Sequence, residues 1–237
     1  MPIVDPPFKR QTEPPPGYTF SYSQPVRPAQ PKATYTLLGL MAGTYILELV
    51  VAGLSQEWFE LVFPISYGWW LHPWQLVTST FSHASLTHLF FNGLFFYFFG
   101  PNIEGIIGRR RFVVLFLVTG AISGVVQVHL PAILTNLSGY DFGSSAGALG
   151  ASGALMGVFG VSLILLPNSK MIVFPIFVPV PLWVGGIFFV LLDLVGALNP
   201  NSGVGNFAHL AGLALGILYG LQVKEGLRRR GLKIVHG

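Results

Sequence analysis

A serine and a histidine in apolar surroundings are the residues of this sequence best suited to chemistry. Ser152 lies in GALGASGALMGVFG, residues 147–160, and His209 lies in AHLAGLALG. A serine hydroxyl becomes an effective nucleophile when a base takes its proton, and a neutral imidazole does this near pH 7. The two groups must then approach to ~2.6–3.2 Å. We predict Ser152 as the nucleophile and His209 as the general base of an acyl-transfer reaction.

Two hydrogen-bond donors occur together in HASLTHLFFN, residues 83–92. His88 and Asn92 are one helical turn apart, so they lie on the same face of a helix. Both side chains can donate to the oxyanion that forms when a serine attacks a carbonyl, and one such donor typically contributes about 2.7–4 kcal/mol. The backbone amide of Ser152 is a further candidate, because the first amides of a helix are free.

The composition indicates that these residues lie in a membrane. Hydrophobic residues make up 52% of the 237 residues and charged residues 9%, against roughly 25% charged in an average soluble domain. Several apolar runs approach the ~20 residues that a helix needs to cross a bilayer. The sequence contains no cysteine, which excludes thiol chemistry and cysteine-based metal sites. We therefore predict an all-α membrane protein.

The apolar runs predict six transmembrane helices. They cover about residues 36–54, 84–100, 111–130, 148–166, 171–196 and 206–222. In the fifth run, proline is expected to delay the helix to near Leu182. The proline-rich segment 1–34 is predicted to be a disordered cytoplasmic tail, 35–222 the membrane domain, and 223–237 a basic cytoplasmic tail.

Every lysine and arginine lies on one side of this arrangement. They occupy the first tail, the second and fourth connections and the end of the chain, and the first, third and fifth connections have none. Basic residues remain cytoplasmic, so both termini are predicted to be cytoplasmic. This placement explains the net charge of +4 without a nucleic-acid partner. The simplest setting is a prokaryotic plasma membrane, with the lipid bilayer as a partner.

The predicted orientation places the reactive residues at one depth. The second, fourth and sixth spans all enter from outside, and His88, Asn92, Ser152 and His209 lie in their first turns. Small residues let membrane helices approach closely. The fourth span carries Gly153 and Gly157 at such a spacing, and the sixth repeats it at Gly212 and Gly216. The first external connection, 55–83, contains four of the five tryptophans and is expected to lie partly in the membrane surface.

Together these motifs resemble the signature of the rhomboid family of intramembrane serine proteases. The resemblance rests on HASLTHLFFN, on GASG around Ser152, on AHLAGLALG, and on FGPNIEGIIGRRRF with Glu104 and Gly108. It covers about residues 36–222. It implies a rhomboid-like bundle of six transmembrane helices, and a Ser152–His209 dyad that needs no cofactor or metal.

The resemblance also implies an oxyanion site and a class of substrate. The oxyanion would be bound by His88, Asn92 and the Ser152 amide. Substrates would be single-span transmembrane proteins, cut near the external end of the span. A small residue is expected at the scissile bond, beside Gly153.

Several positions near the site are expected to be structural. Where many family members have a tyrosine that stacks on the catalytic histidine, this chain has Met156, whose thioether can pack against an imidazole edge. Gln75 follows Trp74 where the family often has arginine. His83 is expected to tie the first connection to the second span, and Gly212 to serve helix packing.

Two other functions would use the same membrane helices. A non-catalytic rhomboid-like protein would bind transmembrane segments, but such relatives typically lack the serine or the histidine. A transporter would use the intramembrane acids Glu48 and Asp193, for which a hydrogen bond inside the bundle is the favoured role. The absence of His-Glu-x-x-His excludes a zinc protease of that type. An aspartyl protease needs two neighbouring carboxyl groups, and Asp193 is the only aspartate in a span.

Overall fold

The computed structural model describes residues 30–143, 147–172 and 178–231, which are mostly helical. The α-helices in these ranges are α1 (Lys32–Leu54), α2 (Gln56–Val62), α3 (Gln75–Phe81), α4 (Leu86–Ile107), α5 (Arg109–Ser138), α6 (Ser152–Leu165), α7 (Leu182–Ala197) and α8 (Asn206–Arg229). A 3-10 turn η1 (Trp69–Leu71) lies between α2 and α3, and two short strands, β1 (Lys170–Ile172) and β2 (Pro179–Pro181), pair antiparallel. Within the described ranges, α1, α5 and α8 are long and apolar enough to cross a membrane, and α6 and α7 are shorter apolar helices.

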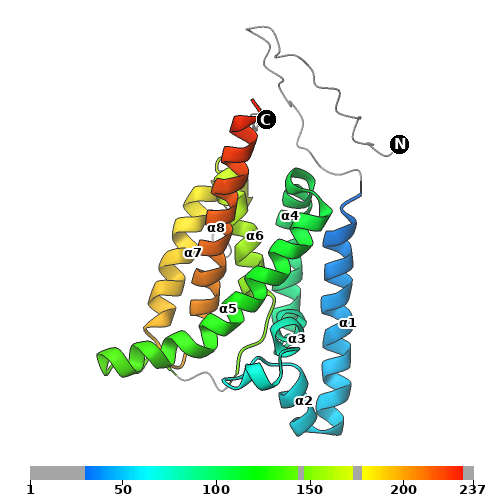
Figure 1. Cartoon of the computed structure of the whole chain (residues 1–237), viewed down its shortest axis with the longest axis vertical. Coiled ribbons are helices and arrows are strands. Elements are labelled where there is room, and N and C mark those ends of the chain that lie inside the picture. The colour runs from blue at the N-terminus through cyan, green and yellow to red at the C-terminus, as the bar shows by residue number, and fades with distance from the viewer. Residues whose placement is uncertain (1–29, 144–146, 173–177, 232–237) are drawn as a thin grey trace.

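The helix α6 lies at the centre of the bundle. It packs against α8 most extensively and also against α5 and α4. Figure 1 shows α1 at one edge of the molecule, α7 at the opposite edge, and α5 crossing obliquely between them. The start of α1 and the end of α8 lie at the same end of the bundle (Figure 1).

Glycines bring α6 and α8 into backbone contact. A Cβ added at Gly212 would overlap the carbonyl oxygen of Gly153, and one added at Gly216 would overlap that of Gly157. Any larger residue at these positions would push the helices apart. The small-residue pattern of the sequence therefore coincides with the closest helix–helix contact of the bundle.

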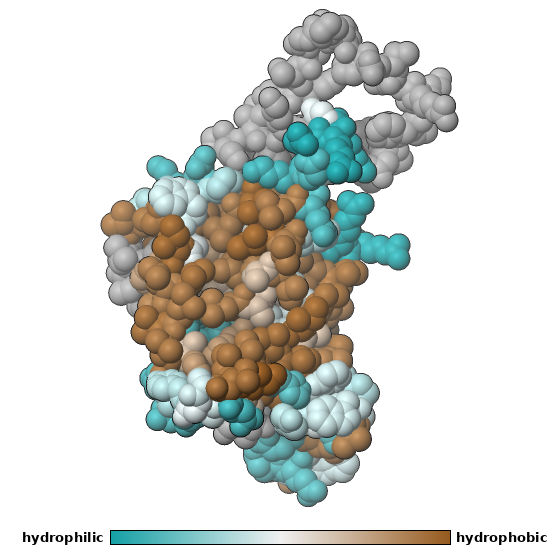
Figure 2. All heavy atoms as spheres, turned by 60° about the vertical axis from the view of Figure 1, so that its left-hand side comes forward, coloured by the Kyte–Doolittle hydropathy of each residue, from teal (hydrophilic) through white to brown (hydrophobic). Residues whose placement is uncertain are grey.

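The outer surface suits a lipid environment. On the face shown in Figure 2, hydrophobic residues form a broad band, with hydrophilic residues at both ends of it. Large apolar side chains on α1, α4 and α7 are more than half exposed, among them Ile46, Phe98 and Ile187. In water such a surface would be an aggregation site, whereas hydrocarbon solvates it.

The helix boundaries follow the predicted spans, except that three helices run on at their C-terminal ends. The helix α4 passes through Pro101 and ends at Ile107, beyond the predicted end at residue 100. The helix α7 begins at Leu182, directly after Pro181, as expected. The helix α5 passes through Pro131 and ends at Ser138, beyond the predicted end at residue 130. The helix α8 continues to Arg229, beyond the predicted end at residue 222, where Glu225 pairs with Arg228 and Arg229. The strand pair before α7 was not expected, and most of the 1–34 tail lies outside the described residues.

The connection between α1 and α4 is an ordered substructure rather than a plain loop. Gln75 is buried, accepts hydrogen bonds from the backbone N–H and the hydroxyl of Ser66, and donates to the carbonyl of Leu61. Trp69 Nε1 donates to His129 Nε2 of α5 at 3.1 Å, which joins the connection to the bundle. The neutral amide of Gln75 thus organises this segment.

Two buried glutamates tie separate segments of the chain together. Glu104 of α4 accepts from the backbone N–H groups of Ala33 and Thr34 and from the Thr34 hydroxyl, all at 2.8–3.0 Å. The two backbone N–H groups belong to the first turn of α1, where they have no partner within the helix, and no side chain caps this end of α1 at its N-cap residue. Glu48 of α1 accepts from the backbone N–H of His83 at 3.1 Å. Both acids therefore act as ties between segments.

Candidate active site

Ser152 and His209 meet although they come from different helices. Ser152 is the first residue of α6, and His209 lies in the first turn of α8. The Ser152 Oγ lies 2.8 Å from His209 Nε2, within the range needed for proton transfer. The glycine contact between α6 and α8 begins one residue after Ser152 and one turn after His209, so it sets this distance.

A third group, which the sequence did not assign to the site, holds the other face of the imidazole. Asp193 Oδ1 of α7 lies 2.9 Å from His209 Nδ1. When Nδ1 carries the proton and donates it to Asp193, Nε2 is free to accept the Ser152 hydroxyl proton. The only sequence signal was an isolated acid in an apolar helix, for which we predicted no more than a hydrogen bond inside the bundle.

The predicted oxyanion donors lie beside Ser152. A Cβ added at Gly150 would lie 2.7 Å from His88 Cε1 and 3.8 Å from Ser152 Oγ. Gly150 therefore lies between the His88 ring and the Ser152 hydroxyl and is close to both. Gly150 also has φ +130°, which favours glycine. Asn92 is buried, and its Nδ2 has no hydrogen-bond partner among the described residues. A buried amide without a partner is available to a ligand.

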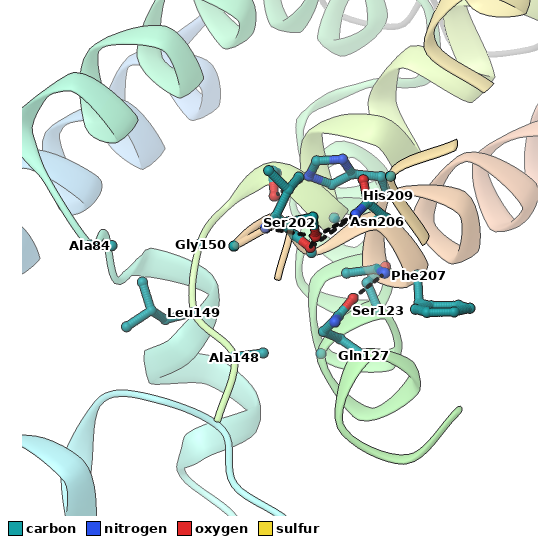
Figure 3. Close-up of a pocket in the computed structure, with 18 of the residues that line it drawn as sticks. Ala84, Ser123, Gln127, Ala148, Leu149, Gly150, Ser202, Asn206, Phe207 and His209 are labelled. Atoms are coloured by element: carbon teal, nitrogen blue, oxygen red, sulfur yellow. Dashed lines mark hydrogen bonds between the residues drawn. The ribbon is translucent and has the colours of Figure 1, made fainter. Parts of the chain in front are cut away.

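These residues line one cavity of about 700 Å³. His88, Asn92, Ser152, Gly153 and His209 all contribute to its wall. Figure 3 shows His209 and Asn206 on one side, Gly150 with Leu149 and Ala148 on the other, and Ser123 and Gln127 of α5 below them. The cavity is large enough for an extended peptide segment together with water. No three His, Asp or Glu side chains gather as a metal site in the ranges 30–143, 147–172 and 178–231.

The three predicted structural residues lie outside the cavity wall. His83 is buried, with Nδ1 3.0 Å from the carbonyl oxygen of Phe81, and its ring meets that of His88 edge to face at 5.1 Å. Burial, aided by nearby His88, lowers the pKa of His83 to about 4, so this ring is neutral near pH 7. Met156 joins an apolar cluster with Phe159 and Leu213, and Gly212 lies in the α6–α8 contact.

Much of the chain is similar to known proteins. A family model described as the rhomboid domain matches residues 71–225, which is more than half of the chain. "Rhomboid protease GlpG" of Yersinia pestis is 28% identical over 208 residues, which is 86% of this chain and 66% of that protein. "Putative rhomboid protease YdcA" of Bacillus subtilis is 29% identical over 166 residues, covering 66% of this chain and 70% of that protein.

Mitochondrial relatives match over a similar part of the chain. "RHOMBOID-like protein 12, mitochondrial" of Arabidopsis thaliana is 30% identical over 158 residues, which is 64% of this chain and 46% of that protein. The chain thus spans less than half the length of this relative. The matched region includes the helices that carry His88, Asn92, Ser152, Asp193 and His209. This chain belongs to the rhomboid family.

Proposed function

We propose that the protein is an intramembrane serine protease that cleaves single-span transmembrane proteins near the external membrane surface. One observation carries the proposal: the Ser152 Oγ lies 2.8 Å from His209 Nε2 in the wall of a cavity of about 700 Å³. A hydroxyl and an imidazole at this distance form a nucleophile–base pair, and the cavity supplies room for a peptide carbonyl and for water. Family membership and relatives named as proteases support the same reaction.

The mechanism follows from the positions of the side chains. Ser152 Oγ attacks the scissile carbonyl while His209 Nε2 takes its proton. The resulting oxyanion accepts hydrogen bonds from the Asn92 amide, the His88 ring and the Ser152 backbone N–H. His209 then protonates the departing amine, which leaves an acyl-enzyme on Ser152. A water molecule, deprotonated by His209, attacks this ester and releases the second product.

The proposed orientation places both termini on the cytoplasmic side of a prokaryotic plasma membrane, in a bundle of six membrane-spanning helices. The active site then lies just below the external surface. A substrate helix would reach it between α4 and α7 and unwind beside Gly153. Because Gly153 and Gly150 border Ser152 closely, a small residue at the scissile position fits best.

Removing the amide of Asn92 tests the oxyanion site. In the Asn92→Ala variant, kcat for a single-span reporter should fall by about 10²–10³-fold with little change in KM, because the lost hydrogen bond forms only with the oxyanion. The variant Asn102→Ala makes the same change on the same helix, where the amide donates to the Phe98 carbonyl, and should keep its activity. Equal kcat for Asn92→Ala and the native chain would exclude Asn92 from the site.

Active-site labelling separates a protease from a non-catalytic rhomboid-like binding protein. A fluorophosphonate should label the native chain, because it reacts with an activated serine, and should not label Ser152→Ala. Ser162→Ala is the matched control, since Ser162 lies on the same helix and bonds to the Val158 carbonyl. Labelling of both the native chain and Ser152→Ala, or of neither, would count against the protease.

A further inference from the structure

We infer that Asp193 is a positioning residue, which extends the Ser152–His209 pair to a three-residue triad. This inference rests on the proposed protease function. Asp193 holds the imidazole in the tautomer that leaves Nε2 free and stabilises the imidazolium that forms during attack.

The geometry of the ring carries this role. The two imidazole nitrogens of His209 have separate partners, Asp193 Oδ1 at 2.9 Å and Ser152 Oγ at 2.8 Å. An ionised carboxylate can only accept a hydrogen bond, so when Asp193 is ionised the shared proton lies on Nδ1. That proton leaves Nε2 as the acceptor facing the hydroxyl. The imidazole thus bridges α6, α7 and α8, and its tautomer is set by a helix that does not carry the nucleophile.

The burial of Asp193 also supports a role in positioning the His209 ring. The residue is 6% exposed and interrupts an otherwise uncharged apolar helix, LWVGGIFFVLLDLVGA. A carboxyl group inside a membrane bundle is costly unless it is paired, and His209 is the charge partner that it has in the described structure. Packing alone would be served better by an apolar side chain.

The backbone of α7 and α8 is arranged to make this contact. A Cβ added at Gly196 would lie 2.5 Å from Asn206 Oδ1, so the end of α7 touches the start of α8 through a glycine. Asn206 is itself held by hydrogen bonds to Ser202 and to the carbonyl of Val204. The helices run antiparallel from this point. Asp193 lies one turn before Gly196 and His209 one turn after Asn206, so the close approach brings the two side chains opposite each other.

The contacts that the structure gives the His209 ring are its hydrogen bonds with Asp193 and Ser152. Met156 lies one turn after Ser152 on α6 and offers a flexible thioether rather than an aromatic plane. In a soluble Ser-His-Asp triad, replacing the aspartate by asparagine lowers kcat by about 10⁴-fold because the wrong tautomer results. We expect a substantial part of this fall in kcat when Asp193 is replaced by asparagine.

The test is the isosteric Asp193→Asn variant, assayed with a single-span reporter. We expect kcat to fall by about 10²–10⁴-fold with little change in KM, and fluorophosphonate labelling to slow in parallel. Asp193→Glu, which keeps the carboxylate, should recover part of kcat. The matched control Asp141→Asn changes an exposed aspartate after α5 that bonds to the Gly143 N–H, and should behave as the native chain.

A spectroscopic signature distinguishes positioning from packing. In micelles, protein with 15N-labelled histidine should show a strongly deshielded Nδ1–H proton that is coupled to His209 and lost in Asp193→Asn. Native kcat and labelling in Asp193→Asn would overturn the positioning role. So would a loss of kcat that matches only a loss of folded protein, with no recovery in Asp193→Glu. Failure of the native chain to be labelled at Ser152 would instead overturn the protease function itself.

Discussion

Replacing His209 by alanine is expected to lower kcat for a single-span reporter by about 10⁴–10⁶-fold, as loss of the base does in serine proteases. The variant removes His209 Nε2, which lies 2.8 Å from the Ser152 Oγ and accepts its proton. The measurement is reporter cleavage by purified protein in proteoliposomes. His72→Ala is the control, because His72 lies outside the cavity wall in the connection between α1 and α4.

A double variant shows whether the two residues act as one unit. If Ser152 and His209 perform a single proton transfer, Ser152→Ala combined with His209→Ala should be no slower than either single variant. The expected residual rate is that of water attack assisted by the oxyanion donors. If the fold losses in kcat of the two single variants multiplied in the double variant, Ser152 and His209 would not act as one catalytic pair across their 2.8 Å contact.

Adding one methyl group at Gly212 is expected to destabilise the bundle and uncouple the site. A Cβ there overlaps the carbonyl oxygen of Gly153, the residue next to Ser152, so α8 must move away from α6. The free energy of unfolding should fall by about 1–3 kcal/mol, the usual cost of overpacking. Because His209 lies one turn from Gly212, cleavage should also fall, by about 10²-fold for a displacement near 1 Å.

The control for Gly212→Ala is Gly226→Ala, which should change the free energy of unfolding in the opposite direction. Gly226 lies on the same helix with nothing within 4 Å of an added Cβ. Helix propensity alone favours alanine over glycine by about 0.8–1 kcal/mol, so Gly226→Ala should raise the free energy of unfolding and leave cleavage unchanged. Equal stability gains in both variants, measured by steric-trap or denaturant unfolding, would contradict the close α6–α8 packing.

The sequence was sufficient to pair Ser152 with His209, whose side chains the structure brings together. Ser152 and His209 could be paired because both stand near the starts of apolar segments with small residues at helical spacing, and such segments pack closely. Pro181 marked the start of α7 because proline is tolerated in a first helical turn but not beyond it. These signals depend on nearby residues in the sequence, so they can be recognised without knowledge of the fold.

The features that the sequence did not predict depend on three-dimensional arrangement. The pairing of Asp193 with His209 depends on how α7 rotates about its own axis, which the nearly uniform apolar sequence of this helix does not reveal. The ordered segment held by Gln75 is built from helices of seven residues, too short for a periodic pattern. The extension of α5 past Pro131 shows that a long helix absorbs the loss of one hydrogen bond.

The Glu104 cap has a consequence for how the chain is made. The first turn of α1 depends on a carboxylate that lies 70 residues later in the chain than Thr34. At about 5–20 residues per second, a ribosome needs about 4–14 s to add that stretch. During biogenesis the leading end of α1 therefore waits in the headgroup region with open amides, and it closes only when α4 arrives. A nascent chain stopped before Glu104 would leave that end exposed to water and to quality-control proteases.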